Sequence, residues 1–143
     1  MQHSILVPAA VLVIWTLIVL GWLMATRLQA MTKLGIDLTK SAPGGRGQDL
    51  QGIIPDNAMW KAHNYTHLHE QPTLFYAAVA ILAISGAGFG FNAQIAWCYV
   101  ILRIIHSIWQ ATVNTIMPVR FGLFLLSSLC LLVLAVRALM AVI

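Results

Sequence analysis

Charged side chains are scarce in this sequence. Only 8% of its 143 residues are Asp, Glu, Lys or Arg, whereas 60% are hydrophobic. An ordinary soluble domain has about a quarter charged residues, and the mean hydropathy here is +0.86. A chain this short and this apolar has too few polar groups to cover a surface in water, so we expect lipid to be its solvent.

Several motifs and residue types are also missing. There are only two cysteines, Cys98 and Cys130, and each lies within an apolar run, which favours buried thiols over a disulfide. We find no phosphate-binding glycine loop, nucleophile elbow or paired-cysteine metal motif, which removes several classes of enzyme. The eight Lys and Arg residues are scattered and form no basic patch with interleaved aromatics, so nucleic acid is not an expected partner.

Long apolar runs dominate what remains. A helix needs about 20 apolar residues to cross a bilayer core, and the sequence predicts a single domain over 1–143 that is an all-α, integral membrane four-helix bundle. The predicted spans are about 5–29, 58–84, 93–116 and 119–140, with a polar loop over about 30–57. Asp56 is the expected N-cap of the second helix. Tight turns are predicted over 85–92 and 117–120.

The distribution of basic residues predicts the orientation. The first loop and its flanks carry Lys and Arg, and Arg120 follows the third span, whereas the turn over 85–92 has neither residue. By the positive-inside rule, the first loop is cytoplasmic and both termini lie outside.

Polar residues recur inside two of the apolar helices. His63, His67 and Glu70 share one face of the second span because they are spaced by four and three residues, and Asn64 lies beside them. Pro72 should kink this helix just beyond Glu70.

The third span carries a second polar stripe, at Arg103, His106, Gln110 and Asn114. Ionisable groups at bilayer depth cost several kcal/mol, from about +2.5 upward, unless they find a partner or water, so Glu70 and Arg103 are expected to pair. The two stripes are open to two interpretations: polar contacts that hold the bundle together, or the lining of a polar ligand's site.

These segments, in this order, resemble a known family. The residues that carry the resemblance are Asn64-Tyr65-Thr66-His67-Leu68-His69-Glu70-Gln71-Pro72, then Arg103-Ile104-Ile105-His106-Ser107, then Asn114 and Pro118-Val119-Arg120. They resemble the membrane-associated proteins in eicosanoid and glutathione metabolism (MAPEG), which include microsomal glutathione transferases, leukotriene-C synthase and microsomal prostaglandin E synthase. The chain looks most similar to the bacterial branch. The resemblance implies a homotrimer in the bacterial inner membrane, with glutathione bound between subunits at the cytoplasmic side.

The resemblance also implies roles for single residues. Glu70, Pro72, Arg103 and His106 match the family pattern, and Arg120 resembles the arginine thought to stabilise the glutathione thiolate. His63, His67 and Gln110 stand where the characterised enzymes have Arg, Asn and Tyr. The expected glutathione-binding residues are therefore Lys61, His63, Asn64, His67, Glu70, Arg103, His106 and Gln110, with Arg120 as the catalytic residue.

The leading hypothesis is a glutathione transferase or peroxidase that acts on an apolar small molecule from the lipid. Arg103 and Lys61 would hold the glutathione carboxylates, Glu70 its amino group and Arg120 its thiolate. Arg120 is equally explained as a topology charge at the membrane surface.

Two other functions remain open. One is a metal site, because imidazoles and a carboxylate are suitable ligands; the candidates are His63, His67, His69, Glu70 and His106. The other is a non-enzymatic interaction subunit of a larger membrane complex, which would bind partners through ordinary apolar helix surfaces.

Overall fold

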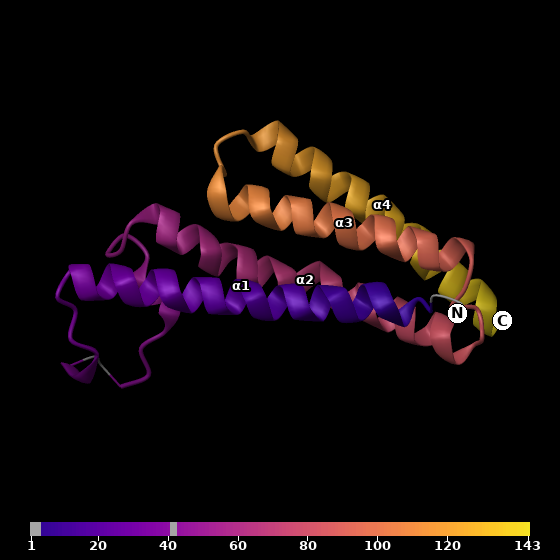
Figure 1. The fold of residues 1–143 in the computed structure, drawn as a ribbon, viewed down its shortest axis with the longest axis horizontal. Coiled ribbons are helices and arrows are strands. Elements are labelled where there is room, and N and C mark those ends of the chain that lie inside the picture. The colour runs from indigo at the N-terminus through magenta and orange to yellow at the C-terminus, as the bar shows by residue number, and fades with distance from the viewer. Residues whose placement is uncertain (1–3, 41–42) are drawn as a thin grey trace.

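The computed structural model of the chain describes residues 4–40 and 43–143. In those ranges it contains four long helices, which run alternately up and down (Figure 1): α1 Leu6–Lys33, α2 Asp56–Ile84, α3 Phe91–Thr112 and α4 Met117–Val142. Two short 3-10 helices, η1 (Leu38–Lys40) and η2 (Gly47–Leu50), lie in the connection between α1 and α2. No β-strand occurs in the described ranges. The predicted all-α, four-helix architecture is confirmed.

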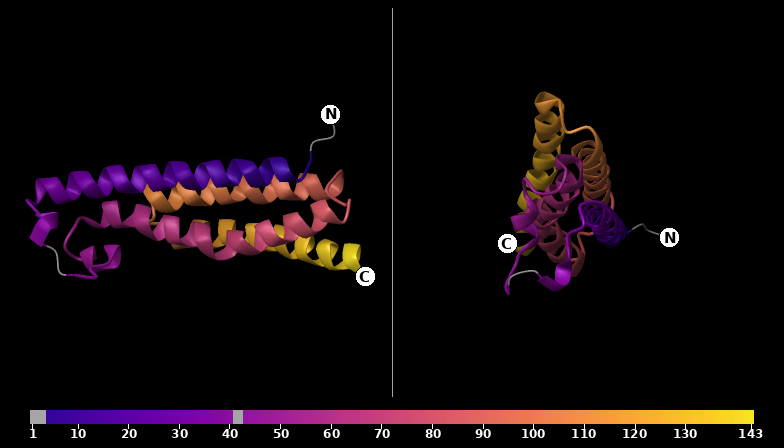
Figure 2. Two further views of the ribbon diagram at one scale, coloured as in Figure 1. Left: turned by 90° about the horizontal axis from the view of Figure 1, so that it is seen from below. Right: turned by 90° about the vertical axis from the view of Figure 1, so that its left-hand side faces the viewer.

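Three helices of the described chain are long and apolar enough to cross a membrane, namely α1, α3 and α4. α2 has 29 residues, but it is not one of the three because its first half carries the polar stripe. Four spans were predicted; three of the described helices are shown to be apolar enough, and α2 is a long helix whose first half is polar. α2 nevertheless runs alongside the other helices (Figure 2) and packs against each of them.

The packing places α2 and α3 at the centre of the bundle. α1 and α4 each contact both central helices, whereas no contact joins α1 to α4 in the described part of the chain. The main core cluster lies between the helices, and within it the rings of Phe75 and Tyr99 stack at 4.3 Å with an interplanar angle of 18°. Many leucines on the outer faces of α1 and α4 are exposed, which is the pattern of helices whose solvent is lipid.

The two ends of the bundle carry different connections. The α1–α2 connection and the α3–α4 turn lie at one end, and the α2–α3 turn lies at the other with Ser4 and the C-terminus (Figure 1). At the second end, the Ile5 amide donates to the Gly88 carbonyl at 2.9 Å. A Cβ on residue 88 would stand 2.9 Å from the Ile5 side chain, so this close approach needs glycine.

Several predicted boundaries shift. Asp56 is the first residue of α2 and makes no capping bond, because Pro55 occupies the cap position. The last turn lies at residues 113–116, not at 117–120, since Pro118 falls in the first turn of α4, where its missing N–H costs nothing. α1 extends to Lys33, four residues beyond its predicted end at 29. Residues 41 and 42 of the predicted loop lie outside the described residues.

The η1 segment is held by local polar contacts. The carboxylate of Asp37 accepts hydrogen bonds from the hydroxyl of Thr39 at 2.6 Å and from its amide at 3.0 Å. These bonds hold the pKa of Asp37 below its ordinary value. The same carboxylate lies 3.7 Å from the ammonium of Lys40.

Candidate functional site

A polar cavity of about 430 Å³ opens at the end of the bundle that carries the α1–α2 connection. Its walls come from five elements, α1, η2, α2, α3 and α4, and it is rich in basic and amide side chains. We call this space the polar cavity. Its lining residues are Arg27, Gly47, Gln48, Gln51, Met59, Ala62, His63, Thr66, His67, Gln110 and Arg120.

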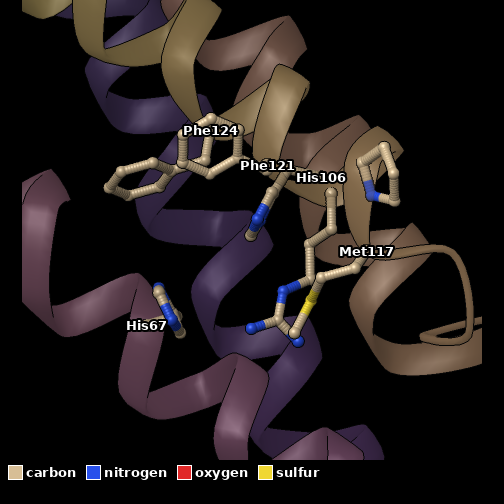
Figure 3. A pocket seen from close by; sticks show the side chains of 7 residues that line it. His67, His106, Met117, Phe121 and Phe124 are labelled. Carbon is tan, nitrogen blue, oxygen red and sulfur yellow. The ribbon is translucent and has the colours of Figure 1, made fainter.

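An apolar pocket of about 580 Å³ adjoins the polar cavity. It lies between α2, α3 and the first turns of α4, and Figure 3 shows His67 of α2 across it from His106 of α3. We call this space the apolar pocket. Its lining residues are His67, His106, Met117, Pro118, Arg120, Phe121 and Phe124. His67 and Arg120 line both spaces, so the two cavities meet at these side chains.

The apolar pocket is built around three rings from three helices. The ring centroids of His67 and His106 lie 5.9 Å apart, and those of His67 and Phe124 lie 6.3 Å apart with the rings edge to face. His106 and Phe124 are 6.4 Å apart. This arrangement brings two predicted site residues of different helices together, as the sequence periodicity indicated.

Arg120 is oriented by the turn that precedes α4. Its Nη1 donates to the Oδ1 of Asn114 at 2.9 Å. Asn114 has a φ of +43°, a conformation that Asn tolerates better than most residues. A guanidinium has five N–H donors, so the bond to Asn114 orients Arg120 and leaves other donors to face the two cavities.

Arg27 reaches the polar cavity from the end of α1. Its Nη2 donates to the carbonyl of Gly47 in η2 at 3.4 Å. A Cβ on residue 47 would meet the Arg27 guanidinium, the end of a flexible side chain, so a larger residue here would require Arg27 to move. Arg27, Gln48 and Gln51 are lining residues that were not predicted from the sequence.

Some of the buried polar atoms that make no hydrogen bond within the protein belong to residues that line the polar cavity. Within the described residues, the Arg27 Nε, His67 Nδ1 and Gln110 Oε1 atoms have no hydrogen bond, and all three side chains line this cavity. A buried polar atom with no partner costs about 1–3 kcal/mol, and lipid cannot satisfy it. The polar cavity is therefore a place for water or for a polar ligand.

Arg103 is placed differently from the prediction. It is 1% exposed, and its Nη2 donates to the main-chain carbonyl of His67 at 2.9 Å. α2 continues through Pro72, which has no N–H to donate to the carbonyl of Leu68. The guanidinium thus packs against the α2 backbone just before the interrupted hydrogen bond, and its Nε and Nη1 have no partner among the described residues.

The prediction that Glu70 and Arg103 form an ion pair is wrong. Glu70 lies on the outer face of α2 with 59% of its side chain exposed, and its Oε2 is 3.5 Å from the Nδ1 of His67. No contact within ion-pairing distance joins Glu70 to Arg103 in the described structure. Arg103 instead donates to a backbone carbonyl inside the bundle, whereas Glu70 faces outward.

Asn64 is buried in a structural network. Its Nδ2 donates to the Oγ of Ser107 at 2.8 Å, and the indole Nε1 of Trp15 donates to the same oxygen at 3.0 Å. This one hydroxyl therefore joins α1, α2 and α3. Asn64 lines neither cavity, although the sequence placed it in the ligand site.

Lys61 points away from the polar cavity. Its ammonium lies 5.4 Å from the centroid of the Trp22 indole and donates to the carbonyl of Asn57 at 2.6 Å. It faces α1, so the structure does not bring it together with His67 or Arg120. Of the predicted residues, His63, His67, Gln110 and Arg120 line the polar cavity, and His106 lines the apolar pocket.

Among the described residues, the histidines do not form the metal centre that the sequence left open as an alternative. No group of three His, Cys, Asp or Glu side chains among the described residues is close enough to hold a metal ion. His69 is turned away, and its Nδ1 contacts the carbonyl of Tyr65 at 2.9 Å. The hypothesis of a metal site formed by His63, His67, His69, Glu70 and His106 is therefore not supported by their geometry.

Comparison with known proteins gives one match. A family model described as the MAPEG family matches residues 5–140, which is nearly the whole chain. No curated protein and no solved structure matches.

Proposed function

The chain belongs to the MAPEG family and is an integral membrane protein, and on that premise we propose that it binds glutathione in the polar cavity and delivers its thiol to an apolar molecule in the apolar pocket. The observation that carries this proposal is the junction of the two cavities at His67 and Arg120. A water-soluble thiol and a lipid-soluble partner need two such spaces that meet at one point.

The polar cavity suits glutathione in size and in chemistry. Its volume lies in the range of about 300–1,000 Å³ that is usual for small-molecule sites. Arg27 supplies a cationic donor for a carboxylate, and Gln110, Gln48 and Gln51 supply amides. The unpaired Nε of Arg27 and Oε1 of Gln110 would then find partners on the ligand.

Arg120 is the residue we assign to the thiol. Glutathione supplies a nucleophilic sulfur when it is bound, and a free thiol with a pKa of about 8.5 is mostly protonated at neutral pH. The Arg120 guanidinium cannot lose its own charge, so it favours the thiolate at the junction. Asn114 holds Arg120 in place for this role, and the rings of His106 and Phe124 exclude water from the reacting partner.

The exposure of the Glu70 carboxylate is an argument for assembly with further copies of the chain. A carboxylate that faced lipid at this depth would cost at least about 2.5 kcal/mol, and the Glu70 side chain is 59% exposed on the isolated chain. We propose that neighbouring subunits of a homotrimer cover this face of α2. In the proposed trimer, Glu70 contributes to the glutathione site together with the polar cavity. We also retain the proposed orientation, with the polar cavity toward the cytoplasm of a bacterial cell.

The proposal is tested by measuring the binding of glutathione to the detergent-purified protein with calorimetry. We expect saturable binding, an ultraviolet difference signal from the bound thiolate, and turnover with an apolar electrophile or hydroperoxide; the product, a thioether or an alcohol, distinguishes transferase from peroxidase. Arg120→Leu should retain binding within several fold and lose the thiolate signal together with most of the turnover. Arg46→Leu, which removes an exposed loop arginine, is the matched control.

Two results would overturn the proposal. One is the absence of a heat signal at millimolar glutathione, and the other is an Arg120→Leu protein that behaves like Arg46→Leu. Constant co-purification with a partner protein, combined with no glutathione binding, would instead favour an interaction subunit. The trimer is tested separately by native mass spectrometry, where a purely monomeric protein would exclude it.

A further inference from the structure

A second polar pocket, of about 230 Å³, lies between the end of α1 and the start of α2. It shares no lining residue with the polar cavity or the apolar pocket, so it is a separate site. We call it the α1–α2 pocket, and its lining residues are Thr26, Gln29, Ala30, Lys33, Pro55, Asn57, Ala58 and Lys61.

The two walls of the α1–α2 pocket follow helical spacing. Thr26, Ala30 and Lys33 are separated by four and three residues, so they form one stripe of α1. Asn57 and Lys61 are four residues apart and face them from the first turns of α2. The fold thereby sets one lysine on each wall.

The charge of this pocket is unbalanced. No Asp or Glu lines it, and neither Lys33 nor Lys61 has a carboxylate within ion-pairing distance among the described residues. The Lys61 ammonium donates one hydrogen bond to the Asn57 carbonyl, at 2.6 Å, and lies over the Trp22 indole. An ammonium has three donors, so both lysines have donors left for an anion placed between them.

The depth of the pocket points to the bilayer surface. The first 20 residues of α1, from Leu6 to Ala25, span about 30 Å at 1.5 Å per residue, which is the thickness of the hydrocarbon core. With Leu6 at the far edge of that core, Thr26 to Lys33 lie at the level of the lipid headgroups. Trp22, just inside this level, is a residue type enriched at membrane interfaces.

We propose that the α1–α2 pocket binds the phosphate of an anionic glycerophospholipid such as phosphatidylglycerol. The ammonium groups of Lys33 and Lys61 flank the phosphodiester, and the amide side chains of Gln29 and Asn57 bind its oxygens or the headgroup hydroxyls. The acyl chains lie along the apolar faces of the helices. A bound lipid would thus clamp α1 to α2 at the end of the bundle that also holds the polar cavity.

The experiment is a lipid titration of the full-length protein in detergent, read by native mass spectrometry. Phosphatidylglycerol is compared with phosphatidylcholine, which has the same phosphate but no net charge, and with inorganic phosphate. We expect one tightly held phosphatidylglycerol per subunit, weaker phosphatidylcholine, and no displacement of the lipid by equimolar inorganic phosphate. Equal binding of the two lipids, or displacement by inorganic phosphate, would overturn the proposal.

Variants locate the lipid. Each lysine near an anionic surface contributes about fivefold to binding, so we expect about fivefold weaker binding in Lys33→Gln or Lys61→Gln and about thirtyfold in the double variant. Lys33→Arg/Lys61→Arg should retain binding. Lys40→Gln is the matched control, because Lys40 already lies beside Asp37, and it should change binding less than twofold.

Glutathione binding should be unchanged in the double variant, which shows that the protein is folded and that the two sites are independent. Phosphatidylglycerol binding as tight in the double Gln variant as in the natural chain would refute the proposal. If the double variant does not fold, the two single variants decide the same question.

Discussion

The hydroxyl of Ser107 offers the sharpest test of which polar residues hold the bundle together. It is fully buried and accepts hydrogen bonds from the Nδ2 of Asn64 at 2.8 Å and from the Nε1 of Trp15 at 3.0 Å. Ser107→Ala removes one oxygen and almost no volume, and it leaves two donors from two other helices without an acceptor.

The expected loss of stability follows from those two bonds. Interhelical hydrogen bonds in membrane proteins average about 0.6 kcal/mol each, whereas a buried donor without a partner costs about 1–3 kcal/mol. We expect Ser107→Ala to lower the free energy of unfolding by about 1 to 3 kcal/mol. Because Ser107 and Asn64 line neither cavity, the affinity for glutathione should not change.

The assay is reversible unfolding in mixed micelles of increasing denaturing detergent, followed by tryptophan fluorescence or circular dichroism. Thr112→Ala is the control, because its exposed hydroxyl bonds only to the Ile108 carbonyl of its own helix, at 2.6 Å. Trp15→Phe removes one of the two donors, so it should cost less in the Ser107→Ala background than alone. Equal losses for Ser107→Ala and Thr112→Ala, or strict additivity with Trp15→Phe, would refute the network.

Three further predictions concern the remaining polar and aromatic groups. Gln71→Leu removes the acceptor of the Tyr99 hydroxyl, at 3.4 Å, and the donor to Ser128, at 2.6 Å, and it should cost about 1 kcal/mol or more in the same unfolding assay; an unchanged midpoint would contradict this. Phe124→Ala opens the apolar pocket and should raise the KM of an apolar substrate at least about tenfold without changing glutathione affinity, as steady-state kinetics and calorimetry can establish. Glu70→Leu should weaken a trimer whose interface includes this carboxylate, so native mass spectrometry at rising detergent should show more monomer; a trimer as stable as that of the natural chain would place Glu70 outside the interface.

The helices were predictable from the sequence, but their exact ends were less so. The apolar runs give the positions of α1, α3 and α4, because a helix that is surrounded by lipid must consist mostly of apolar residues. Pro118 was interpreted as part of a turn, yet it lies in the first turn of α4, where proline is also favoured. Proline is favoured both in a turn and in the first turn of a helix. The sequence therefore does not fix the residue at which α4 begins, which depends on how the helices pack.

The pairing of polar residues could not be predicted to the same degree. Periodicity correctly placed His67 of α2 and His106 of α3 on faces that meet. It could not show that Arg103 contacts a backbone carbonyl while Glu70 faces outward, because spacing along one helix does not fix its rotation against the next. Gln48 and Gln51 lie in a connection without helical periodicity, so no sequence pattern marked them as part of the cavity.

Hydrogen bonding separates the two interpretations that the polar stripes left open. The hydroxyl of Ser107 and the amide of Gln71 each bond to two or more helices, line no part of the polar cavity and are the polar contacts of a stable bundle. Arg27 and Gln110 line the polar cavity and have buried atoms, Nε and Oε1, that make no hydrogen bond among the described residues. Unpaired buried atoms also occur outside the cavity, on Asn64, Arg103 and Trp109. Those at the cavity therefore support the proposed polar ligand only together with the basic and amide side chains that line it.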